Sequence, residues 1–293
     1  MTIHKKINIQ MKNLVTILVI LLASTSILAQ SSIDSSDTYE KNRIRAIVEM
    51  GFLSVIDHKV QFSNSGTYFD YDNQGGQDVL FPVKRFSIEL DYNERNTIVF
   101  LYQPLRLESQ VLLENDLIVD ELTYPAGTSV KLLYNFPFYR FSYLRWLNTK
   151  SNRFNMAIGG SLQLRNATIS FESSDGTRFR TNRDVGPVPA LKIKSRSLVG
   201  SKGFVEFEAD GIYAPISYLN GSDNEVTGAI LDASLRAGLK LKEPLSVFFN
   251  LRYLGGGAVG TSDVKANEPG DGYVRNWLHF STFTLGLMYD WPY

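Results

Sequence analysis

The sequence predicts an all-β chain that crosses a membrane as an antiparallel up-and-down β-barrel of about ten strands, within a range of roughly eight to twelve. Apolar residues alternate with polar or small residues along most segments, which is the period of a β-strand with two different faces. The connections between these segments alternate between long and short, as loops and turns do on the two sides of a membrane barrel. After the N-terminal region no apolar run of about 18 residues or more occurs, so no membrane-spanning helix is expected.

The first 29 residues are expected to be a secretory signal peptide. Lys5, Lys6 and Lys12 make a basic start, and the apolar run over 14–22 is too short to span a bilayer as a helix. Cleavage is expected near Ala29, although Ile27 is larger than the residue usually found at that place, which leaves the cleaved bond open. Residues 30–44 are predicted to be a flexible lead-in, and the barrel is predicted over 45–293.

Composition excludes several classes of function. Basic and acidic residues number 30 each, and the expected signal peptide holds three lysines and no acid, so the mature chain has a net charge of about −3. This balance gives no basis for binding nucleic acid. The absence of cysteine excludes disulfides and zinc–thiolate sites. Segments 220–224 and 263–271 carry oxygen ligands that suit calcium but lack EF-hand spacing, so neither a metal nor a cofactor is expected.

Ten strands are expected in order. They cover 45–55, 85–92, 97–107, 129–146, 154–171, 188–198, 204–216, 227–242, 245–254 and 275–293. The long connections are 57–77, 108–128, 172–186, 218–226 and 255–272, and with the N-terminus in the periplasm all of them face outward. Segment 108–128 is predicted to contain a small hairpin, and Pro137 is predicted to interrupt its strand because proline donates no hydrogen bond to a ladder.

A soluble β-sandwich would produce similar alternation. Aromatic residues gather near the ends of the expected strands, where the interfacial girdles of a membrane barrel fall. The residues concerned are Tyr92, Tyr134, Tyr143, Trp146, Tyr213, Tyr218, Tyr253, Tyr289 and Trp291. This distribution favours the barrel.

The last strand has one apolar, aromatic-tipped face, and the chain stops on Tyr293. It resembles the closing strand of bacterial outer-membrane β-barrels, in which the terminal aromatic belongs to the signal read by the assembly machinery. The resemblance implies a location in the outer membrane of a Gram-negative bacterium. It also implies contact with outer-membrane lipid and lipopolysaccharide, and recognition of Tyr293 by the barrel assembly machinery.

Charged residues on the second face of several strands are the candidates for the barrel interior. They are Glu89, Asp91, Arg165, Glu206, Glu208, Asp210, Asp232, Arg236, Lys240 and Arg252. Unpaired charges would be costly there, so we predict an interior network of ion pairs that stiffens a narrow barrel. The alternative is a narrow polar pore or ligand cavity, although ten strands leave little free lumen once side chains are placed.

Three local patterns suggest chemistry. His279 and Ser281 share the lipid-facing side of the closing strand and resemble the His-x-Ser of lipid A deacylase barrels, in which a His-activated Ser attacks an acyl ester. Thr282 stands where those enzymes carry Asn, and no acid is assigned. Asp57 and His58, with Asp70 and Asp72 in the same expected loop, resemble the outward Asp and His groups of omptin proteases. A third pattern is the run Arg178, Arg180 and Arg183, which suits lipopolysaccharide phosphates.

The main prediction is therefore a non-enzymatic outer-membrane barrel with a charge-paired polar interior and extracellular loops that contact partners or ligands. Two alternatives are kept. One is a narrow channel for small solutes, and the other is a lipid A-modifying enzyme that uses His279 and Ser281.

Overall fold

The computed structural model describes residues 42–93, 95–147, 154–215, 225–262 and 270–292. The signal peptide predicted for 1–29 and nearly all of the lead-in predicted for 30–44 lie outside the described residues, as does Tyr293. Residues 43 and 44 already belong to the first strand. No helix in the described ranges is long and apolar enough to cross a membrane.

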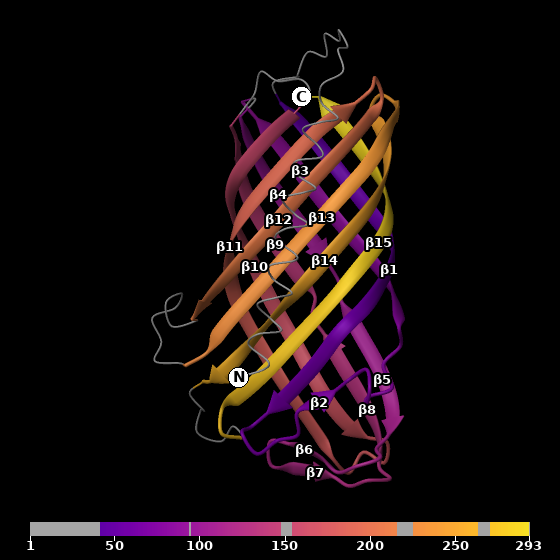
Figure 1. Ribbon diagram of the computed structural model, residues 1–293, viewed down its shortest axis with the longest axis vertical. Helices are drawn as coiled ribbons and strands as arrows, with labels where there is room; N and C mark the ends of the chain where they lie inside the picture. The colour runs from indigo at the N-terminus through magenta and orange to yellow at the C-terminus, as the bar shows by residue number, and fades with distance from the viewer. Residues whose placement is uncertain (1–41, 94, 148–153, 216–224, 263–269, 293) are drawn as a thin grey trace, which may run out of the picture.

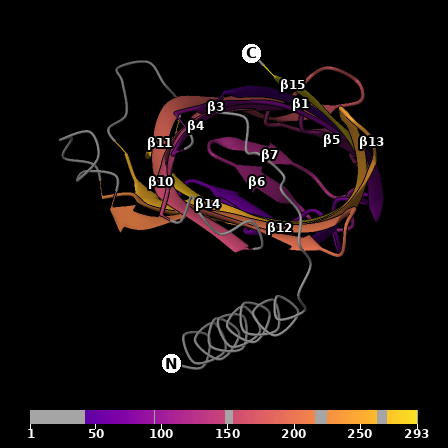
Figure 2. The same cartoon turned by 90° about the horizontal axis from the view of Figure 1, so that it is seen from above.

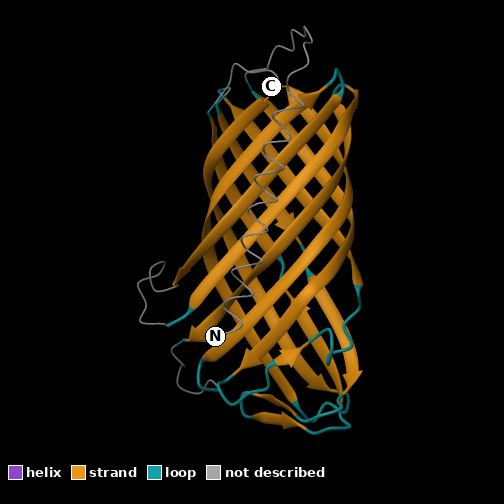
Figure 3. Ribbon diagram, in the orientation of Figure 1, coloured by secondary structure: helices purple, strands orange, loops and turns teal. Residues whose placement is uncertain are grey.

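Ten antiparallel strands form a closed barrel (Figure 1; Figure 3). The first strand, β1 (Arg43–Phe62), pairs with β3 (Leu80–Tyr92) on one side and with the last strand, β15 (Tyr273–Pro292), on the other. The rest of the wall is β4 (Asn96–Gln103), β9 (Phe138–Trp146), β10 (Phe154–Ser173), β11 (Phe179–Val199), β12 (Gly203–Pro215), β13 (Thr227–Lys242) and β14 (Leu245–Thr261). Pairing of β10 with β11 completes the ring. The predicted fold class and strand number are confirmed.

Two wall strands continue after a break. Beyond β4 the chain resumes as β5 (Arg106–Leu112), and before β9 it runs as β8 (Ser129–Asn135), which pairs with both β5 and β10. Pro104 and Pro137 lie in the two breaks, where each removes a ladder donor. The interruption at Pro137 was predicted, whereas the predicted strand 97–107 is in fact divided between β4 and β5.

The segment between β5 and β8 folds over the barrel mouth. It contains the hairpin of β6 (Leu117–Val119) and β7 (Leu122–Tyr124), so the small hairpin predicted within 108–128 is confirmed. Viewed along the long axis, β6 and β7 lie within the outline of the wall (Figure 2). A short strand, β2 (Phe69–Asp70), pairs with the outer part of β1 on the same side of the molecule.

Several predicted loops are shorter than expected. β1 extends to Phe62, β11 begins at Phe179 and β14 extends to Thr261, so parts of the predicted loops 57–77, 172–186 and 255–272 are strand. The sequence prediction ended strands where outward residues became polar. These strands continue beyond the apolar band, where polar residues on the outer face meet water or headgroups.

The exposed apolar residues lie on the outer face of the wall. Examples are Met50, Phe52, Ile88, Phe100, Phe141, Ile158, Leu162, Phe249, Leu285 and Leu287. Along β15 these residues alternate with the buried Thr282, Thr284 and Met288. An apolar exterior around a partly polar interior is the arrangement of a barrel that faces lipid.

Candidate functional site

Charged side chains line most of the half of the interior near the short turns, which we take as the periplasmic half, beside a small buried apolar cluster of Ile47, Phe204, Phe248 and Met288. The charged residues are Arg45, Glu49, Arg85, Glu89, Asp91, Arg140, Lys192, Lys194, Arg196, Glu206, Glu208, Asp210, Asp232, Arg236 and Arg252, all of them buried. We call this set the ion-pair network. Each charge points inward because the side chains of a strand alternate between its two faces.

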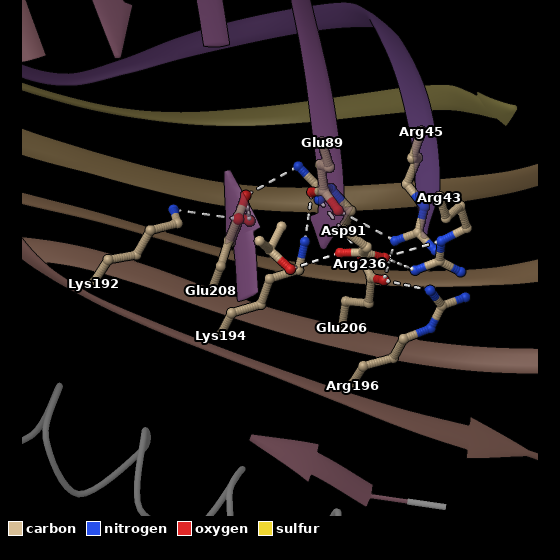
Figure 4. Close-up of polar contacts among 12 residues, drawn as sticks. Arg43, Arg45, Glu89, Asp91, Lys192, Lys194, Arg196, Glu206, Glu208 and Arg236 are labelled. Carbon is tan, nitrogen blue, oxygen red and sulfur yellow. Dashed lines mark hydrogen bonds and ion pairs between the residues drawn. The ribbon is translucent and has the colours of Figure 1, made fainter. Parts of the chain in front are cut away.

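The network joins opposite walls of the barrel. Nη1 of Arg45 on β1 lies 3.3 Å from carboxylate oxygens of both Glu89 on β3 and Glu206 on β12. Nζ of Lys194 on β11 contacts the other oxygen of Glu89. Strands β1 and β3 lie on the far side of the ring from β11 and β12, so these pairs cross the lumen (Figure 4).

Four side chains form a closed ring of alternating charge. Arg85 contacts Glu49 at 3.0 Å and Glu208 at 3.1 Å, and Arg236 contacts the same two carboxylates at 3.1 and 3.0 Å. The second oxygen of Glu49 accepts a hydrogen bond from Asn250 at 2.6 Å. Because each charge has opposite charges on two sides, the ring offsets part of the cost of removing these groups from water.

A second group of charges lies farther toward the mouth. Nη1 of Arg140 lies 2.9 Å from Asp210 and 2.7 Å from Asp232. The guanidinium of Arg252 donates hydrogen bonds to the carboxylate of Asp232 from Nε and Nη2, and Nζ of Lys192 lies 2.7 Å from Asp210. These contacts come from β9, β11, β12, β13 and β14, so the middle of the lumen is occupied by paired side chains.

The outer half of the interior is mostly apolar. Its buried cluster comprises Leu53, Val60, Phe62, Phe69, Tyr71, Phe81, Val83, Leu101, Leu105, Leu107, Leu113, Leu117, Val119, Tyr124, Val130, Leu132, Tyr134, Phe138, Ile169, Phe171, Leu254, Leu278 and Phe280. We call this cluster the apolar plug. The sequence predicted polar faces for the whole interior, so the plug differs from that expectation. Inward residues beyond the middle of the strands become apolar because they pack against the folded-in segment between β5 and β8.

Cations connect the two interior regions. The guanidinium carbons of Arg140 and Arg252 lie 5.8 and 5.6 Å from the ring centre of Phe138, and that of Arg252 lies 5.9 Å from Phe280. Both rings belong to the apolar plug. Cation–π contact lets a charged layer lie against an apolar one without leaving the guanidinium faces unpartnered.

The hairpin of β6 and β7 is fastened to several parts of the wall. The carboxylate of Asp120 accepts a hydrogen bond from Arg180 on β11 at 2.6 Å, and its backbone N–H points to the carbonyl of Phe62 at 3.4 Å. The hydroxyl of Tyr124 donates to the carbonyl of Phe171 on β10 at 2.9 Å. Gly270 lies against this turn with a backbone φ of +96°, a conformation that favours glycine.

Burial changes the acidity of groups in this hairpin. Desolvation raises the pKa of Asp120 despite the adjacent guanidinium of Arg180. Burial likewise raises the pKa of Tyr124 to about 12. Tyr124 is therefore a neutral hydrogen-bond donor at any physiological pH.

Eight of the ten residues predicted to face the interior belong to the ion-pair network. They are Glu89, Asp91, Glu206, Glu208, Asp210, Asp232, Arg236 and Arg252. Arg165 is half-buried and pairs with Asp184 on β11. Lys240 is half-buried near the periplasmic end of β13. A role for any of the ten in binding a ligand stays a prediction.

Sequence reasoning missed several members of the network. Lys192, Lys194 and Arg196 lie two apart on β11 and alternate with outward residues, so this pattern was visible in the sequence. Arg45 and Glu49 were harder to find, because the inward residue between them is the apolar Ile47. When the inward residues of a strand are partly charged and partly apolar, the alternation no longer shows which face is inward.

His279 and Ser281 lie on the outer face of β15, as predicted from their parity. Nδ1 of His279 and the hydroxyl of Tyr253 on β14 form a hydrogen bond of 2.7 Å. Within the described part of the chain, no hydrogen bond joins His279 to Ser281. Asp57 is the backbone partner of His279, so an acid does lie beside the imidazole. The hydrolytic use of this pair stays a prediction.

The pairing expected between Asp57 and His58 is not formed. His58 is fully buried, with Nδ1 2.6 Å from Oε1 of Gln77 and its ring stacked 4.0 Å from that of Tyr71. Asp57 is partly exposed and pairs with Lys59. Both residues belong to β1, where neighbours point to opposite faces, so the expected loop site is wrong.

The arginine run is also not a loop. Arg180 and Arg183 belong to β11, and only Arg178 lies before that strand. Arg180 is committed to Asp120 in the hairpin. The prediction placed these residues in a loop because the extracellular end of β11 is rich in polar residues.

No group of three or more His, Cys, Asp or Glu side chains in the described ranges is arranged to hold a metal ion. Segment 220–224 and most of segment 263–271, which carried the calcium hypothesis, lie outside those ranges. The structure therefore does not test that hypothesis.

Comparison with known proteins finds no matching family model and no matching curated relative. Among solved structures, the outer membrane protease OmpT of Escherichia coli aligns with a TM-score of 0.47 and 12% identity, over 90% of this chain and 100% of that one. The transport unit of the autotransporter AIDA-I from Escherichia coli aligns at 0.40 and 10%, over 91% and 96%. A Pseudomonas aeruginosa FadL homologue aligns at 0.34 and 7%, over 86% and 90%.

These likenesses are too distant to transfer a role. The chain's own geometry identifies the architecture: ten antiparallel strands close into a ring, with an apolar band outside and paired charges within. The protein has the fold of bacterial outer-membrane β-barrels.

Proposed function

We propose that this protein is a closed, non-conducting outer-membrane barrel whose contacts with other molecules are made by its outer face and extracellular loops. The observation that carries the proposal is the filling of the interior. Paired charges occupy the periplasmic half and the apolar plug occupies the outer half.

Each half alone would oppose passage of a small solute. An ion entering the network would have to replace contacts such as those of Arg236 with Glu49 and Glu208. A polar solute entering the plug would lose its hydration and gain few partners among mostly apolar side chains, which costs several kcal/mol by typical transfer values. The narrow-channel alternative would require both regions to rearrange.

The proposal also includes the partners inferred from the resemblance. Outer-membrane lipid and lipopolysaccharide surround the outer face, and the barrel assembly machinery reads the C-terminal aromatic, Tyr293. Tyr293 lies outside the described residues, so support for its role comes from the sequence alone.

The test is single-channel conductance of the refolded protein in a planar bilayer. We expect no discrete steps from the wild-type protein, and none from a variant in which residues 114–127 are replaced by a short glycine linker, because the ion-pair network remains. A porin of known conductance, inserted into the same bilayers, proves that the insertion assay works. Steps from the folded wild type that change with Glu206→Gln would contradict the proposal and favour a channel.

A further inference from the structure

Three aromatic rings lie side by side on the outer face of the barrel. The ring centres of Tyr253 and His279 are 6.1 Å apart, and those of His279 and Trp277 are 6.3 Å apart with an interplanar angle of 17°. The hydrogen bond between Tyr253 and His279 fixes the first pair. We call these three side chains the outer aromatic cluster.

The backbone is shaped to hold this cluster. A Cβ on Gly255 would lie 2.5 Å from both Nδ1 of His279 and the hydroxyl of Tyr253, so the two side chains meet over a residue that has none. On the other side of β15, a bulge between Val55 and Asp57 shifts the register of β1. The shift places Asp57 beside His279, which is a recurrent use of bulges in functional surfaces.

Cations lie next to the rings. Lys59 is the backbone partner of Trp277 and pairs with Asp57 and, at 3.5 Å, with Asp70. The guanidinium of Arg275 lies 4.2 Å from the ring centre of Tyr68. Within the described ranges, no acidic side chain pairs with Arg275.

The position of the cluster along the wall indicates what surrounds it. Toward the periplasm, the outward residues of β15 are Phe283, Leu285 and Leu287, all exposed and apolar. Beyond Ser281 the outward residues become His279, Trp277 and Arg275. The cluster thus lies where the apolar band ends on the extracellular side, at the depth of lipid headgroups.

We propose that the outer aromatic cluster, with Lys59 and Arg275, binds the phosphorylated sugar headgroup of an outer-leaflet glycolipid. The flat ring faces offer contact to the apolar face of a sugar, and their polar edges remain wet. Arg275 supplies charge-assisted hydrogen bonds to the phosphate, and Lys59 offsets the carboxylates of Asp57 and Asp70 beside it. The inference rests on the outer-membrane location in the proposed function, but not on whether the lumen conducts.

Another outward aromatic pair provides a matched comparison. Tyr102 on β4 and Tyr139 on β9 stack 4.9 Å apart on the outer face. An ordinary interfacial girdle needs only such rings. If the cluster were no more than girdle, replacing a ring in either place would have the same effect on bound lipid.

The test is native mass spectrometry of the refolded protein incubated with lipid A that carries both phosphates, or with the same lipid after phosphatase treatment. The variants are K59Q/R275Q and W277L/H279A, and the control is Tyr139→Leu. Folding of each is checked by heat-modifiable migration on a gel. We expect each double variant to retain at least tenfold less phosphorylated lipid than wild type, and the control to retain as much as wild type.

Equal retention by wild type and both double variants would overturn the site. Equal retention of the two lipids by wild type would overturn the choice of a phosphorylated headgroup. Loss of an acyl chain from the lipid that disappears with Ser281→Ala would replace binding by hydrolysis. None of these results depends on conductance, so failure of the site is distinguishable from failure of the closed-lumen proposal.

Discussion

The two halves of the barrel interior solve the same packing problem with different chemistry. In the periplasmic half, charges from opposite walls pair across the lumen, as Arg45 does with Glu206. In the outer half, apolar side chains such as Phe171 and Phe280 pack around a folded-in segment. Charge pairs require specific partners, whereas apolar contacts tolerate many, so we expect the first region to specify the arrangement of strands more strictly than the second.

The two regions also differ in how they contribute to the stability of the barrel. A buried ion pair contributes little net stability relative to apolar residues of similar volume, but breaking one is expensive. An apolar side chain contributes in proportion to the surface that it removes from contact with water. The two regions should therefore respond differently to single and paired substitutions.

The largest effect is expected from breaking one pair in the network. Asp232→Asn leaves Arg252 facing an amide, and destabilisation of about 4 kcal/mol is expected, as for other broken buried pairs. Chemical unfolding of the protein refolded in lipid vesicles measures the change. Glu108→Gln is the control, because Glu108 and Arg106 form a pair in which both side chains are 58% exposed. A similar loss in both variants would contradict the importance of burial.

A slightly smaller effect is expected in the apolar plug. Phe280 is fully buried, and Phe280→Ala should destabilise the barrel by about 3 kcal/mol through the cavity that it leaves. Phe283, on the same strand but facing lipid, is 46% exposed, and Phe283→Ala should have a much smaller effect in the same unfolding assay. Equal effects would mean that the plug is loosely packed.

A paired substitution sharpens the difference between the regions. Replacing both partners, as in D232L/R252M, should recover most of the loss caused by Asp232→Asn, leaving a deficit of about 1 kcal/mol. Arg140 retains Asp210 in that variant, so no carboxylate is left without a cation. A double variant that unfolds as easily as the single one would show that the pair contributes stability in its own right.

Alternation in the sequence was enough to predict the barrel, the strand number and the inward face of most strands. Strand β13 was predicted with its observed bounds because alanine and leucine alternate there with charged residues. The partners across the lumen could not be predicted, since which inward side chains meet depends on the stagger of the closed ring, which alternation does not give. Glu49 and Arg236 are 187 positions apart, and nothing local connects them.

The outer half was harder to predict for another reason. Its interior is completed by the segment between β5 and β8, whose apolar residues show no long alternation. His58 illustrates the consequence, because a polar residue after an outward Asp57 suggested a loop, whereas the strand continues and buries it. The plug depends on contacts between segments that are distant in the sequence, so no local pattern in the sequence predicts it.

The smallest effects are expected from acids outside the membrane, and they should have opposite signs. Burial raises the pKa of Asp120, so the folded state binds its proton more tightly than the unfolded state does. Closure of the hairpin should therefore weaken slightly as the pH rises through the range between the two pKa values.

Asp175 accepts hydrogen bonds from Ser173 and Thr177, which lower its pKa to about 2. The turn around Asp175 should thus be most stable above about pH 4, the ordinary pKa of an aspartate, and should lose stability as the pH falls toward 2. Hydrogen exchange of 117–124 and 173–178 between pH 3 and 7 measures both trends. Asp120→Asn and Asp175→Asn should each flatten only their own profile. Parallel profiles in the two segments would show that global unfolding, and not these carboxylates, controls exchange at the mouth.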